Sequence, residues 1–158
     1  MDWLKETIDE HRVKAAEREK AEAEKKKLQA SQKEERRIEA KEKLLQIKDE
    51  FEKVKAYLVD ENFPCIIELN NKPENEIDIE EIKSVSLTCD TKLPFANNPF
   101  CSYDGSSISF TVDYNYKEYK ISIRYNREPS TDFQKPAKNL QIEYIKDEIK
   151  KFIKNIYK

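Results

Sequence analysis

The sequence contains very little glycine and very little histidine. Among its 158 residues, Gly105 is the one glycine and His11 is the one histidine. A phosphate-binding loop needs several glycines, because only their missing side chains let backbone N–H groups close around a phosphate. A catalytic arrangement of Ser, His and Asp, or of Cys and His, would have to use His11, which lies in a highly charged segment. We therefore expect a non-enzymatic protein and assign no catalytic residue.

Cysteine is also scarce, and its distribution is irregular. The three cysteines are Cys65, Cys89 and Cys101, and His11 lies far from them in the sequence. A structural zinc site takes four ligands at regular spacing, which this set does not supply. We interpret the three cysteines as small buried hydrophobic residues on or beside strands, and we predict no metal and no cofactor.

Long apolar runs and a strong net charge are both missing. No run approaches the about 20 residues that a helix needs to cross a bilayer. The first twelve residues lack the basic start and apolar centre of a signal peptide, so we expect a cytoplasmic protein without a membrane partner. Residues 1–59 carry 16 basic and 15 acidic side chains, and residues 60–158 carry 14 and 17. Neither part is basic enough to indicate nucleic-acid binding by its charge alone.

The first part of the chain is typical of one long helix. Between Asp2 and about Asp60 there is no glycine or proline, and Glu, Lys, Ala, Leu, Gln and Arg dominate. Opposite charges recur four residues apart, and each such pair stabilises a helix in water by about 0.2–0.5 kcal/mol. We predict that Asn62, Phe63 and Pro64 end this helix, because the residue before a proline disfavours helical backbone angles.

Two apolar stripes mark the two ends of this predicted helix. The stripe near its C-terminal end has the 3,4,3,4 spacing of a buried helix face and consists of Leu44, Ile47, Phe51, Val54 and Leu58. The shorter N-terminal stripe consists of Trp3, Leu4, Ile8, His11 and Ala15. We expect the first stripe to pack in a core. We expect the second to mediate oligomerisation, because its apolar residues would otherwise remain exposed.

The helix between the stripes does not fit a continuous coiled coil. Extending the heptad register backward places Arg37, Lys33 and Lys26 at positions where a coiled coil needs apolar residues. The 21 residues from Glu17 to Arg37 include eight basic and six acidic side chains, too balanced for a basic nucleic-acid arm. We interpret residues 1–43 as a projecting charged helix, a possible coiled-coil or oligomerisation arm, and residues 44–158 as a folded domain.

After Pro64 the apolar pattern changes to the twofold period of strands. The four predicted strands are Cys65–Leu69, Val85–Cys89, Ile108–Tyr114 and Tyr119–Tyr125, with a hairpin at Asn115–Glu118. Apolar residues from Leu140 to Ile156 return to helical spacing. The predicted fold class is α+β: a long N-terminal charged helix, then a four-stranded antiparallel sheet covered on one face by the end of that helix and a C-terminal helix. Residues 70–82 fit a short helix, a loop or a further strand.

Two candidate surfaces belong to this domain. In an up-and-down strand order, three connecting segments meet at one end of the sheet, where aromatic residues form either a partner-binding cluster or a lid on the core. These residues are Phe63, Phe95, Phe100, Tyr103 and Phe133. The second surface is a lysine stripe on the last helix, opposite its apolar face, which either meets phosphates or keeps the helix solvated. Its residues are Lys146, Lys150, Lys151, Lys154 and Lys158.

These features together predict a protein-interaction or assembly module that binds a macromolecular partner through the helix arm and the aromatic cluster. The expected partner is a protein, and self-association is a further expectation. One alternative is a nucleic-acid-associated protein that uses the lysine stripe. Another is a small inhibitor or immunity-type protein from a phage or mobile element, since the Lys-, Ile- and Asn-rich composition is typical of an AT-rich genome.

Overall fold

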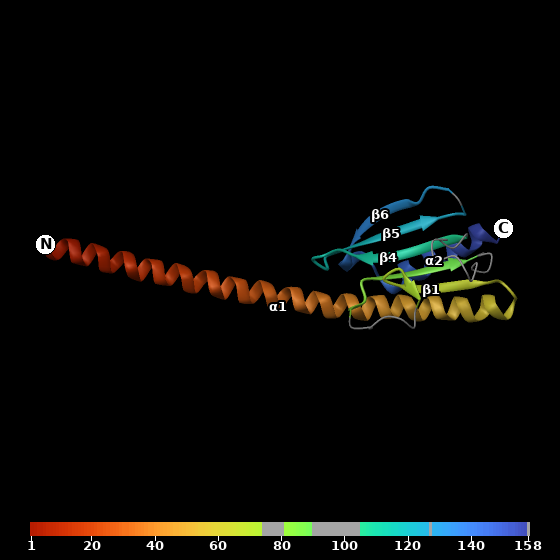
Figure 1. Ribbon diagram of the computed structural model, residues 1–158, viewed down its shortest axis with the longest axis horizontal. Coiled ribbons are helices and arrows are strands. Elements are labelled where there is room, and N and C mark those ends of the chain that lie inside the picture. The colour runs from red at the N-terminus through yellow and green to blue at the C-terminus, as the bar shows by residue number, and fades with distance from the viewer. Residues whose placement is uncertain (74–80, 90–104, 127, 158) are drawn as a thin grey trace. The chain divides into compact units, whose positions relative to one another are not determined.

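The computed structural model describes residues 1–73, 81–89, 105–126 and 128–157 and has an α+β fold (Figure 1). A long N-terminal helix precedes an antiparallel sheet, and a C-terminal helix follows it. The elements are α1 (Asp2–Asp60), β1 (Cys65–Leu69), β2 (Lys72–Pro73), β3 (Ser84–Cys89), β4 (Ser106–Val112), β5 (Glu118–Arg124), β6 (Thr131–Pro136), the 3-10 helix η3 (Ala137–Asn139) and α2 (Ile142–Ile156). The chain divides into two compact units, Met1–Arg36 and Arg37–Lys158, which are described separately.

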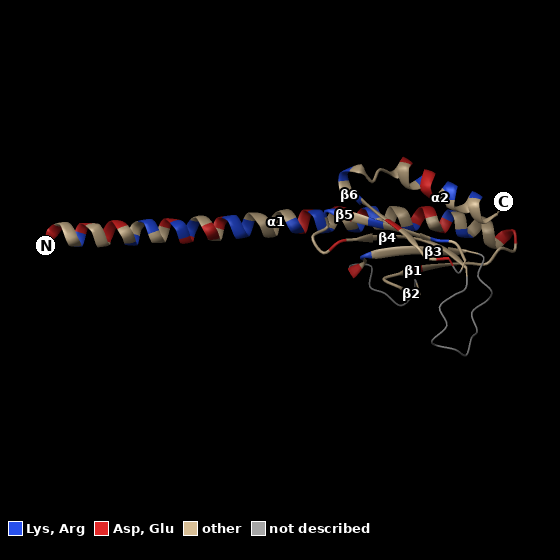
Figure 2. Cartoon of the chain, turned by 90° about the horizontal axis from the view of Figure 1, so that it is seen from above, with Lys and Arg blue, Asp and Glu red and all other residues tan. Residues whose placement is uncertain are grey.

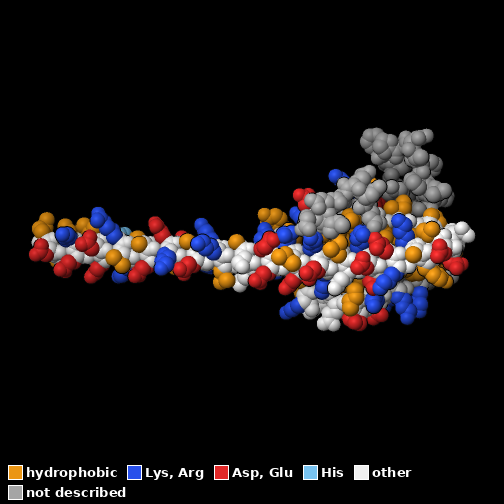
Figure 3. All heavy atoms as spheres, turned by 90° about the horizontal axis from the view of Figure 1, so that it is seen from below, with side chains coloured by type: hydrophobic (Ala, Val, Ile, Leu, Met, Phe, Trp, Pro, Cys, Tyr) orange, Lys and Arg blue, Asp and Glu red, His pale blue; other side chains and the backbone are white. Residues whose placement is uncertain are grey.

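The first unit is helical from Asp2 onward and almost entirely exposed. Lys and Arg alternate with Asp and Glu along it, and apolar side chains are scattered among them (Figure 3). Trp3, Leu4 and Ile8 are 67%, 38% and 44% exposed. The helix in this unit therefore rests on the high helix propensity of its residues and on charge pairs along its surface rather than on a core.

The second unit consists of a sheet with two helices on one face. The sheet has the order β2-β1-β3-β4-β5-β6, and every neighbouring pair is antiparallel. The C-terminal part of α1 and α2 lie on the same side of the strands (Figure 2). In β4, buried residues alternate with half-buried Ser107, Ser109 and Thr111. The alternation confirms that one face of the sheet packs on the core and the other is polar.

The sheet has six strands, so the prediction of four was incomplete. The four expected strands are present as β1, β3, β4 and β5, and β2 and β6 add one strand at each edge. β6 lies between the fourth predicted strand and the C-terminal helix, where we predicted no strand. Phe133 is its one large apolar residue and Pro136 ends it, so it lacks an alternating apolar pattern. β2 contains Pro73 and is exposed, so it has no alternating pattern. Residues 74–80, part of the unassigned stretch 70–82, lie outside the described residues.

The core forms between the inner face of the sheet and the two helices. The predicted stripe of α1 contributes Leu44, Ile47, Phe51 and Leu58, all buried, together with half-buried Val54. The ring centroid of Phe51 lies 6.1 Å from that of Phe110 on β4. α2 contributes Ile145, Ile149 and Phe152. Burial of this stripe, rather than helix propensity alone, anchors the last part of α1.

The end of α1 is fixed by a Schellman motif. Asn62 has a left-handed φ of 64°, its N–H donates to the Val59 carbonyl at 3.0 Å, and the Phe63 N–H donates to the Leu58 carbonyl at 2.8 Å. These two bonds satisfy carbonyls that would otherwise have no helical partner, and Asn tolerates the left-handed angle better than most residues. The predicted stop at residues 62–64 is confirmed.

Hydroxyl side chains line the second face of the sheet. Cross-strand pairing places Glu68, Ser86, Ser109, Ser122 and Asp132 in one row across five strands. The Ser122 hydroxyl donates to Asp132 Oδ1 at one end of this row. At the other end, burial raises the pKa of Glu68 above its ordinary value, because removing water disfavours the charged carboxylate.

Candidate functional site: a lysine-rimmed groove between α1 and α2

An open groove of about 490 Å³ lies between the last turns of α1 and α2 within the second unit. Its apolar residues are Val54 and Leu58 from α1 and Ile149 and Ile153 from α2. Leu58 and Ile149 belong to the buried core, whereas Val54 and Ile153 are only half-buried. The edge of the core is therefore accessible along this groove, and Tyr57, which is 68% exposed, stands beside it.

The rim of the groove is predominantly basic. Lys53 comes from α1, and Lys146, Lys150 and Lys154 come from α2. The one acidic lining residue is Glu50, whose carboxylate is 3.0 Å from the Lys53 ammonium. Four lysines and one glutamate give the lining a formal charge of +3, and the Glu50–Lys53 pair leaves the three lysines of α2 as the unbalanced charges.

The lysine stripe of α2 lies on a different side of the helix from the one that we predicted. We expected the stripe on the side of the last helix opposite its apolar face. The structure instead places three of these lysines at the border of that face, namely Lys146, Lys150 and Lys154. Each lies one or three residues from Ile149 or Ile153, which line the groove, and residues at these spacings lie on the same or an adjoining side of a helix. Lys151 lies outside the groove, 3.7 Å from the Glu148 carboxylate, and Lys158 lies outside the described residues.

The predicted aromatic cluster is only partly within the described residues. Phe95, Phe100 and Tyr103 lie outside them. Phe63 is 43% exposed, and its ring centroid is 4.8 Å from that of Tyr157. Because Phe63 follows α1 and Tyr157 caps α2, this contact joins the C-terminal ends of the two helices that form the groove.

Phe133 does not lie in a loop, contrary to our prediction. It is a residue of β6, opposite Ile121 of β5, and it packs half-buried against the core. The long connection expected after the fourth strand is thus partly an edge strand. The expected loop position of Phe133 was therefore wrong, and its packing against the core is the alternative that the sequence had left open.

Sequence patterns did not distinguish the groove residues from the rest of the core. Val54, Leu58, Ile149 and Ile153 continue the apolar stripes of their helices, and periodicity shows that such residues share a face but not where that face meets solvent. Tyr57, next to Leu58 in the sequence, gave no such signal either, because its exposure beside the groove is seen only in the fold.

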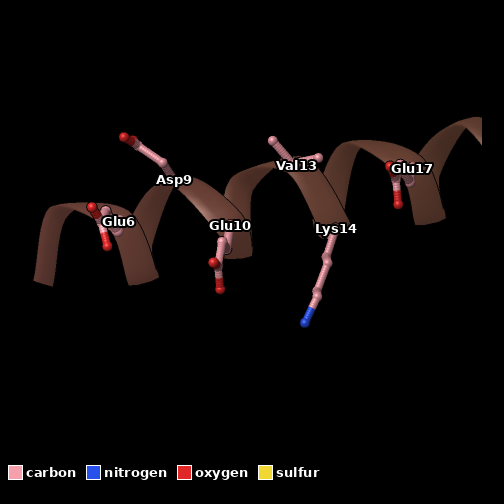
Figure 4. Close-up of a pocket in the computed structure, with 6 residues that line it drawn as sticks. All are labelled: Glu6, Asp9, Glu10, Val13, Lys14 and Glu17. Carbon is pink, nitrogen blue, oxygen red and sulfur yellow. The ribbon is translucent and has the colours of Figure 1, made fainter. Parts of the chain in front are cut away.

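The N-terminal stripe is exposed within its own unit. Trp3, Leu4, Ile8 and His11 are exposed, and Ala15 is half-buried. Figure 4 shows the neighbouring acidic part of the same helix, where Asp9 and Val13 project on one side and Glu10 and Lys14 on the other. The six residues that line this shallow depression all belong to one helix, so it stays open and forms no enclosed binding site.

The described part of the chain contains no metal-ligand cluster and no membrane-spanning helix. Within residues 1–73, 81–89, 105–126 and 128–157, no three His, Cys, Asp or Glu side chains cluster as metal ligands would. None of the helices described is apolar over a length sufficient to cross a bilayer. Burial raises the pKa of Tyr119 well above its ordinary value, with a smaller contribution from Glu39, so this buried phenol stays neutral in the core.

Comparison with known proteins adds no relative, because no protein-family model, curated protein or solved structure matches the chain.

Proposed function

We propose that the protein is a non-enzymatic interaction module, and that its groove binds an acidic amphipathic helix of a protein partner. The observation that carries this proposal is the combination of an apolar floor with a rim of three unbalanced lysines. A groove between two helices suits a third helix that inserts residues at i, i+3 or i+4, and i+7.

The charges of the rim determine the chemistry of the occupant. Lys146, Lys150 and Lys154 repeat every four residues along α2, parallel to the groove. A partner helix with Asp or Glu flanking its apolar stripe would meet these ammonium groups when its apolar side chains reach Val54 and Ile153. Such rim pairs contribute mainly to orientation and association rate, whereas the apolar contacts provide most of the affinity.

Two other partners fit the groove less well. Nucleic acid would leave the apolar floor uncovered, since phosphates contact cations and bases stack on exposed aromatic rings, and no arginine is among the lining residues. A membrane surface is flat and needs apolar side chains that protrude, whereas Val54, Leu58, Ile149 and Ile153 line a depression.

The proposal can be tested with a designed probe. A fluorescent helical peptide with leucines at i, i+4 and i+7 and flanking glutamates is titrated with the full chain, and its anisotropy is measured. We expect the double substitution Lys150→Glu and Lys154→Glu to weaken binding about tenfold, because each exposed pair contributes about 0.2–1 kcal/mol and reversal replaces attraction with repulsion. Tyr57→Ala, at an exposed position, should also weaken binding.

The matched control for the single substitution Lys150→Glu is Lys151→Glu, which makes the same change of charge on the same helix outside the groove. It should leave peptide affinity nearly unchanged. Equal losses in Lys151→Glu and in the single variant Lys150→Glu would show that net charge, not the groove, attracts the peptide. Tighter binding of an oligonucleotide than of the peptide at low salt would favour the nucleic-acid alternative instead.

Self-association through the N-terminal stripe remains a separate proposal. It rests on the exposure of Trp3, Leu4 and Ile8, and it commits to a second copy of the same stripe as the occupant. Light scattering of the full chain should give a mass above that of the monomer, and deletion of residues 1–16 should restore the monomer. A monomeric full chain at high micromolar concentration would contradict it.

A further inference from the structure

Two cysteines lie directly opposite each other in the sheet. Cys65 is the first residue of β1, Cys89 is the last residue of β3, and the cross-strand register pairs them. Neither is part of a disulfide, and they are 6% and 0% exposed. They share the core-facing side of their strands with Ile67 and Leu87. Their pairing depends on the register between two strands, so the spacing of cysteines along the sequence does not reveal it.

The hydrogen-bond pattern shows what kind of pair they form. The Asn70 N–H donates to the Ser84 carbonyl at 3.0 Å, while the Ser84 N–H donates to Asn70 Oδ1, so these two residues occupy a hydrogen-bonding position of the β1–β3 ladder. Hydrogen-bonded and non-hydrogen-bonded pairs alternate along an antiparallel ladder. Five steps along the registered pairs from Asn70 and Ser84 lead to Cys65 and Cys89, which therefore form a non-hydrogen-bonded pair.

That type of pair has the geometry of a disulfide. Opposite residues in it have Cα atoms about 4.5 Å apart and closely spaced side chains. A disulfide requires a Cα separation of about 4.4–6.8 Å. The fold thus brings the two sulfur atoms within bonding reach without a change in strand pairing.

The surroundings of Cys65 favour its thiolate. A hydrogen bond from the Cys89 thiol, opposed by burial and supported by the charge of Lys55, lowers the pKa of Cys65 below its ordinary value. Cys65 Sγ also lies 4.0 Å from the Lys55 carbonyl, to which it donates when protonated. The thiolate is the nucleophilic form of cysteine, so Cys65 is the more reactive member of the pair.

We propose that Cys65 and Cys89 form a redox-active dithiol that a hydroperoxide oxidises to an intramolecular disulfide. The Cys65 thiolate attacks one peroxide oxygen, the O–O bond breaks, and the leaving oxyanion takes a proton, so Cys65 becomes a sulfenic acid. The Cys89 sulfur then attacks the Cys65 sulfur, the S–O bond breaks, and the hydroxyl leaves as water with the Cys89 proton. Two thiols are oxidised and one peroxide is reduced.

The slight exposure of Cys65 and the full burial of Cys89 set this order of events. A small peroxide can reach Cys65 at the edge of the core, and Cys89 then resolves the sulfenic acid from inside. The disulfide would join β1 to β3 and close a loop of residues 65–89. Because this loop restricts the unfolded chain, the disulfide would raise the unfolding temperature of the protein. This site is independent of the groove and of the proposed partner.

The experiment uses the full chain, reduced and then treated with hydrogen peroxide. Intact mass should fall by two hydrogen atoms, and peptide mapping should join Cys65 to Cys89. The unfolding midpoint should rise and return after reduction by dithiothreitol. The Cys101→Ser control retains the pair and should behave as the parent chain, whereas Cys65→Ser and Cys89→Ser should not form this cross-link.

Peptide mapping of the parent chain tests the Cys65–Cys89 pairing even where a serine variant folds poorly. A disulfide that joins Cys101 to either partner, in place of the Cys65–Cys89 cross-link, would overturn it. So would a folded chain in which both thiols stay reduced in excess peroxide while the urea-unfolded chain oxidises readily.

Discussion

Truncation of α1 at two positions should have very different effects on stability. Every residue of the buried core lies between Ala40 and Phe152, so a chain that begins at Arg37 retains the complete core. We expect its free energy of unfolding to match that of the full chain within about 0.5 kcal/mol, since the deleted residues are almost all exposed. A chain that begins at Leu44, the boundary predicted from the sequence, should be clearly less stable.

The magnitude follows from what residues 37–43 contribute. The Lys43 ammonium donates to the Leu140 carbonyl, and a hydrogen bond with a charged partner contributes about 1.5–3 kcal/mol. Ala40 is 3% exposed, and its buried methyl contributes about 0.8 kcal/mol. The combined loss is about 2–4 kcal/mol, and fraying at buried Leu44 adds to it. With a urea dependence of about 2 kcal/mol/M, a typical value for a domain of this size, the midpoint should fall by about 1–2 M.

Urea unfolding measured by near-ultraviolet circular dichroism of the tyrosines suits both truncations, because each removes Trp3 and leaves all eight tyrosines. Equal destabilisation of the two truncated chains would refute the reasoning, since it would assign part of the stability to residues 1–36. Equal stability of both would show that residues 37–43 contribute nothing and that the folded unit begins at Leu44.

Two further predictions concern the sheet. Asn70, at φ 51°, accepts hydrogen bonds at Oδ1 from the Lys83 and Ser84 N–H groups and donates one from Nδ2 to the Glu81 carbonyl. Asn70→Ala should lower the free energy of unfolding in urea by about 2–4 kcal/mol. Asn70→Asp keeps both acceptor bonds and should lower it less. Equal losses of stability in the two variants would contradict this role of the Asn70 side chain. Burial raises the pKa of Glu68 in the folded state above the ordinary 4.5, so the folded chain binds a proton at Glu68 more tightly than the unfolded chain does. The stability of the fold should therefore decrease as pH rises from 4.5 through the raised pKa. Glu68→Gln should therefore be more stable than the parent at pH 7 and equal to it at pH 3, and a variant that is less stable at pH 7 would show that the carboxylate has a favourable partner.

The sequence predicted those parts of the fold in which burial leaves a repeating pattern. The Leu44–Leu58 stripe and the alternation in β4 and β5 identified the elements that face the core. β6 was missed because an edge strand pairs on one side only, so Phe133 alone carries its apolar signal. β2 was missed because its two residues, Lys72 and Pro73, are exposed at the other edge of the sheet and carry no apolar pattern.

The candidate site was less predictable than the fold. The spacing of Lys146, Lys150 and Lys154 placed them on one side of a helix, but only the packing of α2 beside α1 shows that they border an apolar groove. The cysteines show the same limit. Their burial was predicted correctly for Cys65 and Cys89, whereas their opposition depends on strand register, which the sequence pattern does not specify.

The composition of the edge strands has a consequence for aggregation. β2 contains Pro73, which has no N–H to donate, and β6 carries Lys135 and ends at Pro136. Lysine and proline at a sheet edge discourage another strand from joining it. Copies of this chain at high concentration should therefore not extend one another's sheets into fibrils.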